Sequence, residues 1–339
     1  MTRSRGKALT AALLATVLAL GIAELVLRVR FARRMALLER DLGGCVRASA
    51  ARELIYEYTP DRCGHNSRGY FDRERERPKP PGVYRVLVIG DSVAAGIGLV
   101  ERVKRYRFAG VLAVELARVR SAPLDVAVMA RSGYSTGQEL YLLEHEAADY
   151  QPDVIVWSYV LNDPADPFFH DANGELGVFF RRPAVQLVEL VRRAWFFWCE
   201  RRRGRGCPSE YHRFLHCAYA DEVQRNFARI AAWSREHRVP IVMVIHALHP
   251  ARDAANAGRA EGADFTDYAH YPFADLHASI ARAAAAAGLT ALDELDAYRG
   301  AAAADVSLPG DVWHPSARGH LLTGEWLAHQ LEARGLVPR

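Results

Sequence analysis

Short apolar runs alternate with longer segments of helical pattern through most of the chain after residue 81. The runs have four to seven residues, a length that fits buried strands. Strands are expected over residues 85–89, 125–130, 153–159, 240–246 and 289–292. Helices are expected over residues 108–119, 137–149, 221–237, 273–287 and 317–334. This alternation predicts an α/β fold, a doubly wound three-layer sandwich whose central parallel sheet is covered by helices on both faces.

The N-terminal part of the chain has a different pattern. Residues 8–27 form a run of 20 residues that is apolar except for Glu24 and has basic residues on both sides. A helix of this length spans roughly 30 Å, the thickness of the hydrocarbon core of a bilayer. A cleaved signal peptide is the alternative, but its apolar core would be shorter and would end in a small-residue cleavage site. Residues 1–34 are therefore expected to be an N-terminal tail and a transmembrane signal-anchor.

Two features bear on which side of the membrane holds the rest of the chain. Basic residues near both ends of the apolar run slightly favour a cytoplasmic C-terminal side, whereas a short tail before a large domain favours export. The five cysteines fall into two groups, Cys45 with Cys63, and Cys199 with Cys207 and Cys217. Disulfides within each group would suit an oxidising compartment, and free buried thiols are the alternative. We expect an extracytoplasmic domain, on the periplasmic or cell-surface side.

The rest of the chain divides into two parts. Residues 35–81 are a connector that ends in a charged, proline-rich stretch, and residues 82–339 are expected to form the α/β domain, with insertions near 164–219 and 251–270. The first insertion is the expected lid or substrate-determining segment, because loops at strand ends carry specificity. Its residues 183–199 have an apolar helical pattern that ends in aromatic residues. We expect this helix to pack against the core; contact with a membrane surface is the alternative.

Polar residues with complementary chemistry follow the expected strands. The first three strands are followed in order by Gly90-Asp91-Ser92, Ser132-Gly133-Tyr134 and Leu161-Asn162-Asp163, and the last helix is preceded by Asp311-Val312-Trp313-His314. The carboxyl ends of parallel strands meet at one edge of a sheet, where ligands bind. A serine becomes nucleophilic when a histidine takes its proton, and a carboxylate orients that histidine. Each motif alone could be a helix cap or a turn, but together they predict a nucleophilic hydrolase.

Four segments resemble the SGNH hydrolases, also called GDSL esterases and lipases, namely VLVIGDSVAAG, SGYSTGQEL, VLND and DVWHPSARGH. The resemblance covers roughly residues 84–335 and implies the flavodoxin-like form of the fold. It implies that Ser92 is the nucleophile, with Asp311 and His314 as the rest of the catalytic triad. It also implies an oxyanion hole formed by the amides of Ser92 and Gly133 and the side chain of Asn162. The stretch upstream of Ser92 is similar to a membrane-anchored bacterial branch of the family.

Two positions depart from the family pattern. Val93 stands where the motif GDSL has leucine, and Val160, in the loop that carries Asn162, stands where many members have glycine. The residues expected to do the chemistry are all present.

The resemblance implies acyl transfer, carried out by a serine ester hydrolase that acts on a small acyl ester such as an acetylated envelope glycan. The first alternative is an O-acetyltransferase of envelope glycans with the same triad, which would need an acyl-donor membrane partner. The second is a non-catalytic, glycan-binding envelope protein. The presence of all four side chains needed for the chemistry argues against the second alternative; they are Ser92, Asn162, Asp311 and His314.

Composition and motifs exclude several further kinds of partner. The formal charge of +4 comes from 44 basic and 40 acidic residues, so nucleic acid is not an expected partner. The chain has no Walker loop, no dinucleotide fingerprint and no cysteine pair with zinc-site spacing, so neither a cofactor nor a metal is expected. His246 and His249 lie at and after the end of the fourth expected strand. Because no third ligand accompanies them, we expect them to line the cleft rather than hold a metal.

Overall fold

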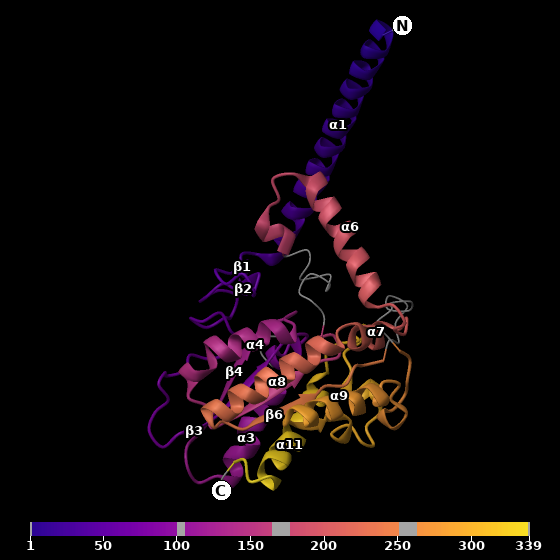
Figure 1. Ribbon diagram of the computed structural model, residues 1–339. Coiled ribbons are helices and arrows are strands. Elements are labelled where there is room, and N and C mark those ends of the chain that lie inside the picture. Colours follow the sequence, from indigo (N-terminus) through magenta and orange to yellow (C-terminus); the bar gives the residue numbers. More distant parts are fainter. Residues whose placement is uncertain (1, 100–105, 165–176, 251–262, 338–339) are drawn as a thin grey trace.

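A parallel sheet forms the centre of the molecule, and helices cover both of its faces (Figure 1). The computed structural model describes residues 2–99, 106–164, 177–250 and 263–337. The five strands lie in the order β4-β3-β5-β6-β7. In chain order they are β3 (Tyr84–Gly90), β4 (Leu124–Ala130), β5 (Val154–Tyr159), β6 (Ile241–Ile245) and β7 (Thr290–Asp293). The predicted fold class is confirmed, and each strand begins and ends within one residue of its expected bounds.

Alternate residues of the strands face opposite helical layers. Val86 and Val88 of β3 pack with α3 (Phe108–Val119) and α11 (Ala317–Ala333). Leu87 and Ile89 pack in a second cluster, to which the helices α4 (Thr136–His145), α8 (Ala220–His237) and α9 (Ala274–Ala287) contribute. Because both faces are buried, the strands are continuous apolar runs, which is why their positions could be read from the sequence.

Shorter elements complete the α/β domain. They are α2 (Ser92–Ala95), α7 (Tyr211–Ala218), α10 (Ala303–Val306) and the 3₁₀ helices η2 (Ala147–Tyr150), η3 (Tyr268–His270) and η4 (Glu294–Asp296). The helix expected over residues 137–149 is thus divided, because α4 ends at His145 and η2 follows. Tertiary contacts accompany this break, since the hydroxyl of Tyr70 donates to Glu146 and Arg68 pairs with Asp149.

The connector is more ordered than its sequence pattern indicates. It contains two short antiparallel strands, β1 (Val46–Ala48) and β2 (Tyr56–Tyr58), and the disulfide Cys45–Cys63. A second disulfide, Cys207–Cys217, spans the end of the first insertion, and Cys199 is a free thiol. Both disulfides therefore form within the groups that the cysteine spacing defined.

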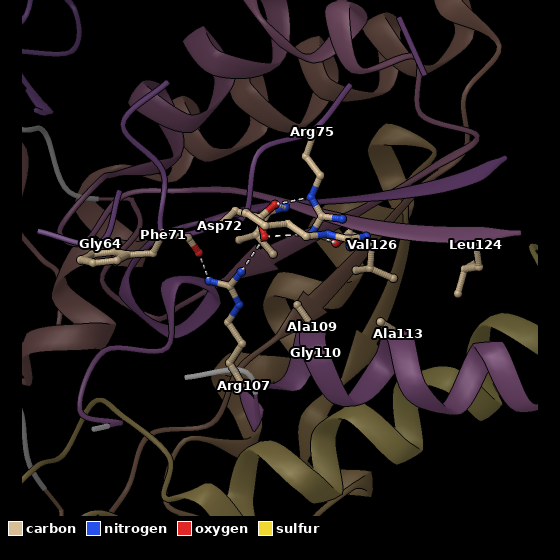
Figure 2. A pocket seen from close by; sticks show the side chains of 12 residues that line it. Gly64, Phe71, Asp72, Arg75, Arg107, Ala109, Gly110, Ala113, Leu124 and Val126 are labelled. Carbon is tan, nitrogen blue, oxygen red and sulfur yellow. Dashed lines mark hydrogen bonds and ion pairs between the residues drawn. The ribbon is translucent and has the colours of Figure 1, made fainter. Parts of the chain in front are cut away.

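The segment that follows β2 covers the outer edge of β4. The side chain of Asp72 accepts a hydrogen bond from the Val128 amide (3.0 Å), and Arg75 donates to the carbonyl of Val126 (2.6 Å). Figure 2 shows Asp72 between Arg75 and Arg107, in the wall of a pocket of about 590 Å³. These contacts block an edge strand that would otherwise offer unpaired backbone groups to another chain.

Two helices extend away from this body (Figure 1). The first, α1 (Thr2–Leu42), is long and apolar enough to span a membrane, and it continues about two turns beyond the expected boundary at residue 34. The second, α6 (Gln186–Arg203), meets α1 rather than the sheet. Our prediction that this helix packs against the core is wrong, because Glu200 is the one side chain of α6 that is buried in the described part of the chain. Most of its large apolar residues are exposed.

The first test concerns the carboxylate that covers β4. Asp72→Ala leaves the guanidinium groups of Arg75 and Arg107 buried without the carboxylate they share, so we expect the free energy of unfolding to fall by about 3–5 kcal/mol. Guanidinium chloride denaturation of the full chain in detergent measures this loss. The matched control is Arg73→Ala, which removes a largely exposed partner of Asp125 and should cost less than about 1 kcal/mol. Equal stability of the two variants would contradict the role of Asp72.

Candidate active site

Ser92 lies at the carboxyl end of β3, in a tight strand-to-helix turn. Asp91 caps α2, because its side chain accepts hydrogen bonds from the Val93 amide and from the Ser92 hydroxyl, both at 3.1 Å. Gly90 is required in this turn, since an added Cβ would lie 2.5 Å from the Cβ of Ser158 on β5. The turn leaves the Ser92 residue 9% exposed, at the edge of the sheet where the sequence predicted a site.

Asp311 and His314 form the second part of the site. Nδ1 of His314 lies 2.7 Å from Oδ2 of Asp311, and Oδ1 of Asp311 accepts the amides of Trp313 (2.7 Å) and His314 (3.0 Å). Burial would raise the pKa of Asp311, but the hydrogen bond and charge of His314 outweigh it and hold this pKa below its usual value. An ionised Asp311 accepts a hydrogen bond from the Nδ1–H group of His314, which leaves the lone pair of the ring on Nε2.

The structure places His314 against the segment that follows Ser92. A Cβ added to Gly98 would lie 3.7 Å from the Cβ of His314. The Ser92 hydroxyl nevertheless donates to Asp91, and Nε2 of His314 is buried without a hydrogen-bond partner in the described part of the chain. The hydrogen bond between a nucleophilic serine and its histidine base is often long in free enzymes, and it shortens when substrate binds.

Backbone hydrogen bonds join the other two predicted loops to the same edge. The amide of Arg131, which precedes the Gly133 turn, donates to the carbonyl of Gly90 (3.3 Å). The amide of Thr136, which follows that turn, donates to the carbonyl of Asp163 (3.1 Å). Gly133 itself has a φ of +77°, a conformation that favours glycine.

The loop that carries Asn162 is fixed by the residue after it. Oδ2 of Asp163 accepts the amide of Val160 (2.8 Å), and the amide of Asp163 donates to the carbonyl of Val160 (3.0 Å). Asn162 is 7% exposed. Valine at position 160 is thus accommodated in a hydrogen-bonded turn, and the structure brings the loops of Ser92, Gly133 and Asn162 together.

Sequence reasoning missed two tyrosines of the connector that hold the Gly133 loop. The hydroxyl of Tyr56 donates to the carbonyl of Ser132 (2.5 Å), and the amide of Ser132 donates to the hydroxyl of Tyr58 (2.9 Å). The hydroxyl of Tyr134 in turn donates to the carbonyl of Tyr56 (2.5 Å). The alternation of Tyr56 and Tyr58 around a polar residue is a strand signal, but it is only three residues long.

The two histidines that follow β6 are almost completely buried, so they do not line an open cleft. Nδ1 of His246 lies 2.9 Å from Oε1 of Glu294, and Nδ1 of His249 lies 2.7 Å from the hydroxyl of Tyr268. The His249 amide donates to the carbonyl of Val312 (2.9 Å), which anchors the turn that carries His314. Among the described residues, no group of three or more histidine, cysteine, aspartate or glutamate side chains could hold a metal ion.

Buried carboxyl groups lie near the start of α2. Burial raises the pKa of Glu139 well above its usual value, and the charges of Asp163 and Asp91 raise it further. Burial likewise raises the pKa of Asp163, with the charge of Asp91 adding to the effect. Both oxygens of Glu139 are without a hydrogen-bond partner among the residues described. Burial and the neighbouring carboxylates thus favour the neutral form of Glu139.

Comparison with known proteins identifies a family model that the chain matches. Residues 88–322 match the model of the GDSL-like lipase/acylhydrolase family. A search of curated proteins finds no match.

Similar solved structures include a lipase/acylhydrolase from Enterococcus faecalis, at 15% identity and a TM-score of 0.41, covering 74% of this chain and 96% of that one. A GDSL-like lipase from Bacteroides thetaiotaomicron has 13% identity and a TM-score of 0.42, covering 74% and 88%. A mutant of an acetyl-xylooligosaccharide esterase from Geobacillus has 12% identity and a TM-score of 0.45, covering 73% and 94%.

The second test concerns the histidine that anchors the His314 turn. Burial lowers the pKa of His249 from 6.5 to about 4, so below pH 6.5 the unfolded chain binds a proton that the folded chain does not. Because of His249, the free energy of unfolding therefore falls as the pH falls from 6.5 towards 4, by about 2 kcal/mol at pH 5. His249→Gln should lose about 2 kcal/mol less than wild type between pH 7 and pH 5, measured by denaturant unfolding.

Other groups titrate alike in wild type and variant, so the difference isolates His249. The control is Ser279→Ala, at an exposed serine of α9, whose pH dependence should match wild type. Parallel curves for wild type and His249→Gln would show that His249 is not held neutral by burial.

Proposed function

Because the chain belongs to the GDSL-like lipase/acylhydrolase family, whose members are hydrolases acting on esters, we propose that Ser92, His314 and Asp311 are its catalytic triad. One observation carries the proposal: the hydrogen bond from His314 to Asp311 leaves Nε2 as a buried base, on a histidine whose Cβ lies against the segment that follows Ser92. The loops of Gly133 and Asn162 are joined to the same edge of the sheet, where they can supply oxyanion donors.

The proposed reaction begins when the Ser92 hydroxyl rotates from Asp91 towards His314. Its oxygen attacks the ester carbonyl while Nε2 of His314 takes the proton, and Asp311 stabilises the imidazolium. The oxyanion accepts hydrogen bonds from the amides of Ser92 and Gly133 and from the side chain of Asn162.

The tetrahedral intermediate then collapses, and the departing alcohol takes the proton from His314. Water attacks the acyl-serine with His314 again as the base, which releases the carboxylic acid and restores Ser92. Each cycle consumes one ester and one water and yields one acid and one alcohol.

The proposed substrate is a small acyl ester, such as an acetyl group on an envelope glycan. The low exposure of Ser92 and Asn162 supports a small acyl group. The proposed location is a single-pass membrane protein, anchored through α1, with its catalytic domain outside the cytoplasm. Two disulfides support this location, since such bonds persist in oxidising compartments.

The third test removes the nucleophile. Ser92→Ala in the full chain should lower p-nitrophenyl acetate hydrolysis by about 10⁴- to 10⁶-fold, because no other group forms the acyl intermediate. Its thermal midpoint should stay at the wild-type value. Ser279→Ala, at an exposed serine of α9, is the matched control and should retain full activity. Full activity in the Ser92→Ala variant would refute the triad.

The fourth test removes one oxyanion donor. Asn162→Ala should lower kcat by about 10²- to 10³-fold with little change in KM, because the lost hydrogen bond forms mainly in the transition state. Steady-state kinetics with p-nitrophenyl acetate separates the two constants. Asn226→Ala on α8 is the control and should leave both unchanged. A rise in KM at constant kcat would assign Asn162 to substrate binding instead.

A further inference from the structure

One side of α6 carries a row of exposed apolar side chains. Val188, Val191, Trp195 and Trp198 are between 42% and 68% exposed. Their spacing of three, four and three residues puts them on one face of the helix. Trp195 and Trp198 stack with ring centroids 4.7 Å apart, and the guanidinium of Arg202 lies 3.9 Å from the ring centroid of Trp198. We call Val188, Val191, Trp195 and Trp198 the α6 stripe.

The opposite side of α6 faces α1. Gln186, Glu189, Leu190 and Arg193 line a groove of about 510 Å³ together with α1 residues between positions 27 and 37. On this side, the first two turns of α6 therefore face the anchor helix. The α6 stripe lies on the outer face, which the described part of the chain leaves exposed.

The start of α6 is fixed to the apolar section of α1. The carboxylate of Glu24 accepts the amides of Gln186 (3.0 Å) and Leu187 (2.9 Å), and Arg28 donates to the carbonyl of Ala184 (2.5 Å). This explains the single acidic residue in the apolar run of residues 8–27, because Glu24 caps a second helix there. If α1 crosses a bilayer, α6 begins where α1 leaves the hydrocarbon.

The direction of α6 then determines what its outer face meets. Figure 1 shows α6 diverging from α1 as it runs towards α7 and the body of the molecule. Because α6 descends from the membrane while moving away from the anchor, the side turned away from α1 faces back towards the plane of the bilayer.

We propose that α6 is a second membrane-contacting helix, whose stripe lies in the interfacial region of the bilayer that α1 crosses. This inference rests on the proposed membrane anchor. Tryptophan favours the boundary between hydrocarbon and headgroups, and the stripe ends in two tryptophans. The helix also carries five arginines and two glutamates, an excess of positive charge that suits anionic headgroups.

Contact with the bilayer would bear on the proposed site through α7. The disulfide Cys207–Cys217 ties the chain after α6 to α7. On α7, the ring of His212 packs 5.3 Å from Trp313, and Nε2 of His216 lies 3.2 Å from the carbonyl of Leu161. Trp313 and Leu161 immediately precede His314 and Asn162, so the attached stripe would hold the loops of the site near the membrane surface. The substrate class that follows is an ester presented at that surface.

Tryptophan quenching by brominated lipid tests the proposal. The full chain is reconstituted into nanodiscs of phosphatidylcholine and phosphatidylglycerol, with or without bromine on the upper acyl chains. Since none of the six tryptophans lies in α1, bromination should lower the wild-type emission only through α6. The double variant W195F/W198F should lose this quenching. Trp233→Phe, at a buried tryptophan of α8, is the matched control and should retain it.

Equal wild-type emission in plain and brominated discs would overturn the proposal. If the stripe were also shielded from acrylamide in those discs, a protein surface such as a second copy would cover it. Failure of the chain to enter discs would overturn the membrane anchor and this inference together. Hydrolysis of p-nitrophenyl acetate in the same discs tests the proposed function separately, since hydrolysis without quenching rejects the stripe alone. Quenching without hydrolysis rejects the esterase and supports the stripe.

Discussion

The carboxylate of Asp311 accepts three hydrogen bonds within its own turn, and the chemistry proposed for the site depends on that arrangement. Two of the bonds fix the backbone of the turn, and the third fixes the ring of His314 with Nε2 free to act as a base. The turn is also bonded to the residues after β6 through His249 and Val312. Behind it, burial would raise the pKa of Glu294, but His246, Thr323 and the Ala247 amide lower it to about 2. The pKa values of Asp311 and Glu294 are thus both held below their usual values near the imidazole of His314.

The connector joins α1, the proposed anchor, to the loops of the proposed site. Tyr56 and Tyr58 hold the loop of Gly133, and Gln138, at the start of α4, donates to the carbonyl of Leu54 (2.8 Å). Farther along the connector, Asp72 closes the edge of the sheet. These residues lie directly after the helix proposed to cross the membrane. If α1 crosses a bilayer, this packed connector sets the distance between the bilayer and the site, and α6 is the second link proposed between them.

The sheet and its helices could be predicted because each strand is buried on both faces and each covering helix has one apolar side. The placement of Ser92, Gly133 and Asn162 after the ends of strands could be predicted because parallel strands share a carboxyl edge. The two strands of the connector could not be predicted, since strands of three residues leave almost no periodic signal. The error at α6 has another cause: periodicity shows that a helix has an apolar face but not what covers that face. The burial of His246 and His249 depends on Glu294 and Tyr268, which are distant in sequence.

The assignment of Ser92 as the nucleophile is the claim on which the proposed function depends. The most direct measurement is to treat the full chain in detergent with a fluorophosphonate and to locate the modified residue by peptide mass spectrometry. The triad predicts one adduct, on the peptide that contains Ser92, and loss of ester hydrolysis in step with labelling. An adduct on another residue, or continued hydrolysis by a chain fully labelled at Ser92, would contradict it.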